Sequence, residues 1–147
     1  MTQEEKFLLL QELCARLPYG VKCHFKYGSA EDDVTLGCID NNVARFEYGW
    51  YGRFHVNVDA NYIKPYLRPM SSMTEEEKKE YDNFLFDNLE REDVIGYEDK
   101  AFGIDVIMRY RSWEVVQWLL EHHLDFNGLI DLGLALEAPN DMYKKGI

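Results

Sequence analysis

The chain has 147 residues with a formal net charge of −11, and 46% of its residues are hydrophobic while 29% are charged. This length and composition favour one folded domain over residues 1–147 and exclude an intrinsically disordered chain. The longest apolar runs are far shorter than the roughly 18 residues of a membrane span, so no membrane association is expected. Direct binding to nucleic acid is also unfavourable, because cations are what bind a phosphate backbone.

The negative charge is concentrated in the second half of the sequence. Residues 1–70 contain eight basic and nine acidic residues, whereas residues 71–147 contain eight basic and eighteen acidic residues. A basic partner is therefore easier to accommodate than an acidic one.

The cysteines and the N-terminus indicate the compartment. Cys14, Cys23 and Cys38 are odd in number and lack CxxC spacing, which argues against a disulfide framework and a structural zinc site. We interpret them as reduced and mostly buried. The first residues are acidic where a secretion signal is basic. We expect a cytoplasmic protein without a cofactor or a metal.

The first half of the chain predicts a helix followed by strands. Residues 5–17 place apolar side chains at helical spacing, and residues 21–27 alternate apolar and polar side chains as a half-buried strand does. Further strands are predicted over residues 34–39, 43–48 and 53–58, with turn-forming residues between them. The expected fold is α+β, with the N-terminal helix packed on a four-stranded antiparallel meander, followed by two further helices.

The two further helices come from the second half. Residues 59–70 contain two prolines four apart, which disfavour both a continuous helix and a central strand, so an extended connector is expected there. Thr74 and Glu77 form a capping-box pattern that predicts a helix over residues 75–90.

After the helix predicted over residues 75–90, the apolar periodicity is less clear. Residues 93–111 fit either an edge strand or part of a long helix, and the periodicity does not separate the two. The second of the further helices is predicted over residues 112–123. The apolar tail, residues 126–136, is expected to pack rather than to extend freely.

A cationic sheet face follows from the alternation in the predicted meander. The basic side chains of the first, third and fourth strands all point opposite to the apolar face, next to two aromatic residues. Such a face can hold a nucleotide, a phosphorylated metabolite or an acidic peptide. An ordinary solvated face with cross-strand ion pairs is the commoner meaning of this pattern. The candidate ligand-binding residues are Lys22, His24, Arg45, Trp50, Tyr51, Arg53 and His55.

The predicted helix over residues 75–90 is rich in carboxylates, which suggests an interaction surface. Its charge spacing can imitate a nucleic-acid backbone and occupy a DNA-binding protein, although such a run is more often a solvated face. The candidate interaction residues are Glu76, Glu80 and Asp87.

The closest approach to a metal or catalytic motif is weak. His122, His123 and Asp125 cluster in sequence, but adjacent histidines on a helix diverge by about 100°, whereas helical ligand pairs are usually four apart. A packing or helix-capping role is favoured. No nucleophile elbow, P-loop or dinucleotide fingerprint is present, so a binding protein is favoured over an enzyme.

A sequence resemblance is carried by residues 63–77, 118–126, 128–130 and 133–139, together with the start over residues 17–21. These segments resemble small uncharacterised proteins of gut Bacteroidetes and of their phages or mobile elements. The similarity spans most of the chain, and the proline-containing segment is its most specific part; residues 53–58 and 93–111 match poorly. The resemblance implies a bacterial or phage cytosolic origin and an accessory role, and it transfers no catalytic residue.

Two functions are therefore predicted. The first is an accessory or regulatory protein of a phage or mobile element that binds a host or self protein through its acidic helix. The alternative is a protein that binds a small ligand or nucleotide on the cationic sheet face. A hydrolase is the least favoured possibility.

Overall fold

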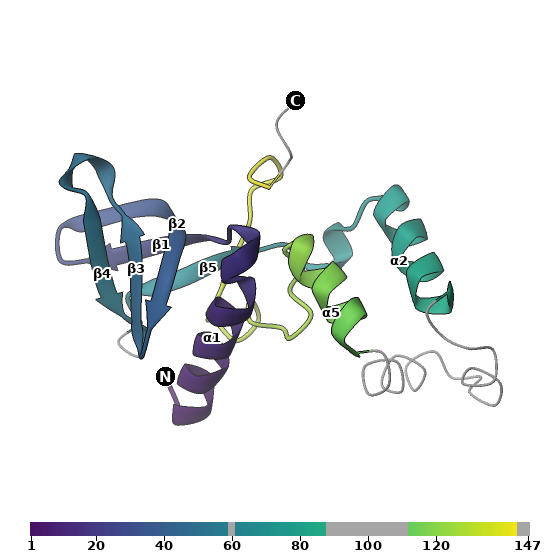
Figure 1. Cartoon of the computed structure of the whole chain (residues 1–147), viewed down its shortest axis with the longest axis horizontal. Helices are drawn as coiled ribbons and strands as arrows, with labels where there is room; N and C mark the ends of the chain where they lie inside the picture. Colours follow the sequence, from purple (N-terminus) through teal and green to yellow (C-terminus); the bar gives the residue numbers. More distant parts are fainter. Residues whose placement is uncertain (59–60, 88–111, 144–147) are drawn as a thin grey trace.

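The N-terminal pattern forms a helix and a meander in the structure, a computed structural model that describes residues 1–58, 61–87 and 112–143. Figure 1 shows the sheet on one side of helix α1 and two helices on the other. The α+β class and the two further helices are confirmed. The helices are α1 (Gln3–Arg16), α2 (Glu75–Asp87) and α5 (Ser112–Glu121), with short 3-10 turns η1 (Leu17–Tyr19), η2 (Gly49–Tyr51) and η4 (Met70–Ser72).

The sheet has six strands in the order β4-β3-β2-β1-β5-β6. Its first four strands pair antiparallel with their chain neighbours, so the predicted meander is confirmed. Two further strands extend it at β1: β5 pairs antiparallel with β1, and β6 pairs parallel with β5. The strands are β1 (Lys22–Tyr27), β2 (Ala30–Asp40), β3 (Val43–Glu47), β4 (Arg53–Asn57), β5 (Ile63–Leu67) and β6 (Leu136–Glu137).

Strand β5 corrects the prediction of an extended connector. Pro65, the middle residue of β5, lies opposite Cys23 at one end of the β1–β5 ladder. The backbone N–H of Lys26 donates to the carbonyl of Tyr62 at 2.9 Å. Hydrogen-bonded and non-hydrogen-bonded pairs alternate along an antiparallel ladder, so Pro65 falls at a non-hydrogen-bonded position and its missing N–H breaks no bond to β1.

Two apolar clusters organise the interior. The larger lies between α1 and one face of the sheet, and the tail contributes Leu129 and Leu134 to it. The smaller joins Val115, Trp118 and Leu119 of α5 to side chains that include Tyr81 of α2. The expectation that the tail packs is thus confirmed, because Leu129 is fully buried.

Capping boxes that can be recognised in the sequence start helices α1 and α2. Thr74 and Glu77 exchange hydrogen bonds of 3.0 and 3.1 Å, as the capping-box pattern predicts. Thr2 and Glu5 do the same at the start of α1. The residues predicted as either strand or helix, 93–111, lie outside the described residues. Among the helices that are described, none combines the length and hydropathy needed to cross a bilayer.

The cysteine prediction was only partly right. All three thiols are free, but Cys14 and Cys38 are exposed and only Cys23 is buried. The register of β2 shifts between Leu36 and Cys38, so the side-chain alternation along β2 changes at this irregularity. Burial raises the pKa of Cys23, which keeps this thiol protonated and unreactive.

Candidate functional site

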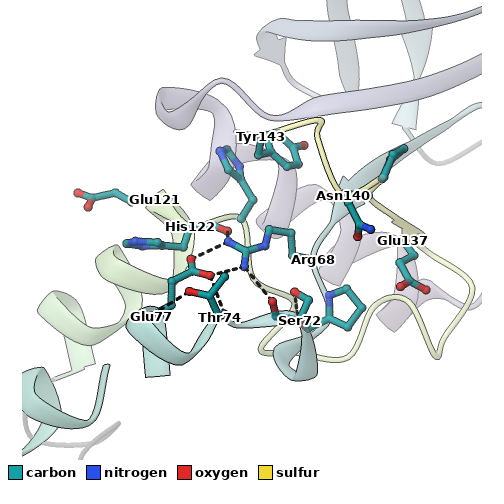
Figure 2. Close-up of a pocket in the computed structure, with 13 residues that line it drawn as sticks. Arg68, Ser72, Thr74, Glu77, Glu121, His122, Glu137, Asn140 and Tyr143 are labelled. Atoms are coloured by element: carbon teal, nitrogen blue, oxygen red, sulfur yellow. Dashed lines mark hydrogen bonds and ion pairs between the residues drawn. The ribbon is translucent and has the colours of Figure 1, made fainter. Parts of the chain in front are cut away.

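A cavity of about 690 Å³ lies where the end of β5, the start of α2, the end of α5 and the C-terminal tail meet (Figure 2). Three of the segments on which the family resemblance rests contribute to its wall. The lining residues are Arg68, Pro69, Ser72, Thr74, Glu77, Glu121, His122, His123, Glu137, Ala138, Pro139, Asn140 and Tyr143.

Arg68 and Glu77 form the central ion pair of this cavity. The two terminal nitrogens of Arg68 donate to the two carboxylate oxygens of Glu77 at 2.8 and 2.6 Å. The same nitrogens also donate to the carbonyls of His122 and Ser72 at 3.2 and 3.3 Å. The bond from Arg68 lowers the pKa of Glu77 to about 2. Arg68 therefore fixes the surrounding segments to one another and offers little to a ligand.

The backbone of Arg68 joins the sheet to the segment after α5. Its N–H donates to the carbonyl of His123 at 2.7 Å, and its carbonyl accepts from the N–H of Asp125 at 2.8 Å. The carboxylate of Asp125 in turn accepts from the N–H groups of Leu129 and Ile130 at 2.8 and 3.0 Å. Asp125 thus caps the turn that starts the tail.

The two histidines have the packing and capping roles that the sequence favoured. Nδ1 of His122 donates to the carbonyl of Trp118 at 2.8 Å, and the two rings stack with centroids 3.9 Å apart. His123 is buried and stacks on Tyr143 at 3.6 Å. Burial, with the nearby Arg16 and Arg68, lowers the pKa of His123 to about 4. Among the described residues, no group of three potential metal ligands comes together.

Tyr143 anchors the tail to the sheet from the far side of the cavity. Its hydroxyl accepts from the N–H of Lys22 at 2.9 Å and donates to the carbonyl of Tyr66 at 2.7 Å. Burial raises the pKa of Tyr143. At neutral pH, then, Glu77 is ionised, His123 is neutral and Tyr143 is protonated. These three groups therefore do not exchange a proton near pH 7.

A second polar network lies behind the cavity, inside the core. Arg16 is fully buried, and its Nε donates to Glu12 at 2.7 Å while a terminal nitrogen donates to the carbonyl of Leu124 at 2.7 Å. The side-chain amide of Asn127 also donates to Glu12. This network ties α1 to the segment after α5. The spacing of Glu12 and Arg16, four residues apart on a helix, is the sequence signal for this ion pair. It does not predict burial, because ion pairs with this spacing usually lie on exposed helix faces.

The structure divides the predicted cationic face into two groups. Strand β2 lies between β1 and β3, so it separates Lys22 and His24 from the other basic residues. His24 is held by this chain's own carboxylates, since Nδ1 lies 2.8 Å from Asp33 and Nε2 lies 2.9 Å from Glu31. The expectation that all of these cations lie together is therefore wrong, because β2 brings carboxylates between them.

The second group does come together. Arg45 lies directly opposite His55, and Glu47 lies opposite Arg53. Trp50, in the turn η2 just before β4, is 87% exposed. Tyr51 lies in the same turn, but its side chain is outside what the structure describes. Ligand binding by these residues stays a prediction.

The acidic candidates lie on α2. Glu76 and Glu80 are exposed, and Glu80 also accepts a hydrogen bond from Nε1 of Trp118 at 3.1 Å. Asp87 is the last residue of α2, and its side chain is not among those described. Glu80 therefore has one role in joining α2 to α5, whereas the side chain of Glu76 makes no hydrogen bond or ion pair within the part of the chain that the structure describes.

Comparison with protein-family models, with curated protein sequences and with solved structures finds no match.

Proposed function

We propose that this protein is an accessory binding protein of the bacterial cytoplasm, encoded by a phage or mobile element, that holds a basic surface of a partner protein. The partner is a host protein or another product of the same element. The contact surface is the acidic half, defined as the described residues 71–87 and 112–143.

The observation that supports the proposal is the separation of charge between the two parts of the fold. The acidic half contains twelve carboxylates and two lysines. One of its carboxylates, Glu77, is neutralised by Arg68, and Glu76, Glu114 and Glu121 are exposed on the two helices. Such a predominantly negative surface attracts a partner of opposite charge and repels nucleic acid and anionic lipid.

An exposed aromatic side chain accompanies these carboxylates. Trp113, in the first turn of α5, is 69% exposed and adjoins Glu114. Tryptophan is among the residues that dominate binding energy in protein interfaces. Exposed carboxylates beside such a residue are typical of a binding surface with a basic partner.

The proposal is tested by quantitative pulldown from a gut-bacterial lysate with a charge-altered variant, Glu76→Lys/Glu80→Gln. Glutamine at position 80 keeps an oxygen that can accept from Trp118, so the packing of α2 on α5 is preserved. The matched control, Glu4→Lys/Glu47→Gln, makes the same change in charge on α1 and β3, and Glu4 also lies in the first turn of its helix.

We expect the captured partner to be lost from the first variant, kept by the control, and released from the native protein by salt. Capture of the same proteins by all three forms would contradict the proposal.

A further inference from the structure

Strand β4 is the terminal strand of the sheet, so only one of its two edges pairs with another described strand. The N–H of Tyr48 donates to Gly52 at 2.9 Å, and the N–H of Val58 donates to Asn42 at 2.8 Å. These bonds place the hydrogen-bonded pairs of the β3–β4 ladder at the even-numbered residues of β4. Arg53, His55 and Asn57 therefore direct their backbone N–H and C=O groups away from β3.

Within the described residues, no other strand pairs with this edge. Natural sheets usually protect such an edge with proline, a bulge or an inward-pointing charge. Strand β4 contains no proline, and its pairing with β3 is unbroken over all of its residues. The edge is thus a regular row of donors and acceptors that another extended chain can extend.

The side chains along β4 indicate which residues an added strand should have. On the outer face, Arg53 and His55 are exposed, and the structure gives neither an ion pair among the described residues. On the inner face, Phe54 is half-buried and its ring lies 6.2 Å from that of Tyr27, which is 51% exposed. An added strand would place alternate residues beside the cations and the others beside these rings.

A second copy of β4 fits this edge poorly. Antiparallel pairing of two copies centred on His55 would place His55 opposite its own copy and Arg53 opposite Asn57, so the basic side chains of both strands would share one face and the added strand would bring no carboxylate to them. Carboxylates at those positions would be stabilising instead. Helices α2 and α5 of the acidic half lie on the side of the molecule away from β4 (Figure 1), and a Debye length of about 8 Å at physiological salt screens their charges.

We propose that the outer edge of β4 receives an extended segment of a partner protein that has carboxylates at alternate positions and apolar residues between them. This surface is separate from the acidic half, so it is independent of the proposed function. It would give Arg53 and His55 acidic neighbours on the open side of β4, whereas Arg45 on β3 already lies 3.8 Å from the carboxylate of Asp40.

The test uses the full chain labelled with 15N and a soluble seven-residue peptide that alternates glutamate with valine, blocked at both ends. Hydrogen exchange of the backbone amides is measured with and without the peptide. We expect added protection at Arg53, His55 and Asn57, whereas the amides of Phe54 and Val56 already bond to β3 and should change little. Affinity is measured from the accompanying amide shifts.

The contribution of the basic side chains is tested with Arg53→Gln/His55→Gln, which removes both of them without adding repulsion. Loss of two cross-strand pairs should weaken peptide binding by roughly two- to thirtyfold. The matched control Lys26→Gln removes a cation from the same sheet face three strands away and should bind as the native protein does.

Three results would overturn the proposal. The first is no binding at peptide concentrations on the order of 1 mM, or protection that does not alternate along β4. The second is equal affinity for the native protein and the Arg53→Gln/His55→Gln variant. The third is a dimer in sedimentation that protects the same three amides without peptide, because the occupant would then be a second copy.

Discussion

The hydroxyl of Tyr143 occupies the place where Lys22 would otherwise bond to β5. The β1–β5 register pairs His24 with Lys64, and its continuation would pair Lys22 with Tyr66. The Tyr143 hydroxyl lies between these two instead, accepting from the N–H of Lys22 and donating to the carbonyl of Tyr66. A residue 121 positions later in the chain thus completes the ladder where the two strands diverge.

Replacing this hydroxyl should lower stability. Tyr143→Phe leaves the N–H of Lys22 and the carbonyl of Tyr66 without their partner, and an unsatisfied buried backbone group costs about 1–3 kcal/mol. We expect a fall of that size in the free energy of unfolding by urea titration, together with faster hydrogen exchange at Lys22. Tyr27→Phe removes a hydroxyl from an exposed ring and should change neither quantity.

Ionisation of Glu77 should make the free energy of unfolding depend on pH in the acid range. Its pKa is lowered to about 2 by Arg68, from an ordinary value of 4.5. The ion pair therefore stabilises the fold fully above about pH 4.5, and this contribution is lost as the pH falls toward 2. Glu77→Gln should remove about 1–3 kcal/mol at pH 7 and flatten the acid dependence measured by denaturant titration.

The matched variant for that measurement is Glu76→Gln. Glu76 lies in the same first turn of α2 but is exposed, so its loss should change stability by less than about 0.5 kcal/mol. Equal effects of the two substitutions would show that the Arg68–Glu77 pair contributes nothing specific.

The buried Glu12–Arg16 pair should show strong coupling. Arg16→Met leaves the carboxylate of Glu12 buried without its cation, and breaking a buried pair on one side costs about 3–5 kcal/mol. The double variant Glu12→Gln/Arg16→Met removes both charges and should cost less than the sum of the two single changes. A double-mutant cycle by chemical denaturation measures this; simple additivity would contradict the ion pair.

Two histidines should titrate on opposite sides of the ordinary pKa of 6.5. The hydrogen bond that His24 donates to Asp33 raises the pKa of His24, so its stabilising effect is complete below pH 6.5 and disappears as the pH rises through the folded-state pKa. Burial lowers the pKa of His123 to about 4, so protonation at this site destabilises the fold as the pH falls below 6.5.

The measurement for both is NMR titration of the imidazole resonances. Asp33→Asn should bring the pKa of His24 back toward 6.5 and leave His123 unchanged. A value for His24 at or below 6.5 in the native protein would contradict the two hydrogen bonds seen at its ring.

Short-range patterns were enough to predict much of this fold. The alternation from Val21 to Val58 gave the meander, and the capping box at Thr74 gave the start of α2. Both signals are read within a few residues, because side-chain direction in a strand and capping at a helix start depend on local geometry. Strand β5 was missed because the cost of a proline depends on its register with β1, which no local pattern contains.

The cavity required the tertiary structure for the same reason. Arg68, His123 and Tyr143 are far apart in the sequence and meet only because β5, α5 and the tail converge. The split of the cationic residues is similar: alternation correctly put Lys22, His24 and Arg53 on one face, but the order of the strands inserted the carboxylates of β2 between them.

The sequence alone therefore determined the class of the helices and of the meander strands, the face that their apolar residues share and the excess of carboxylates after residue 70, since these depend on composition and local periodicity. Only the tertiary structure decided which charges are neighbours, which polar groups are buried and which backbone edge is left unpaired. Those properties arise from contacts between residues distant in the chain, and such contacts set the electrostatic and hydrogen-bonding environment of every candidate site.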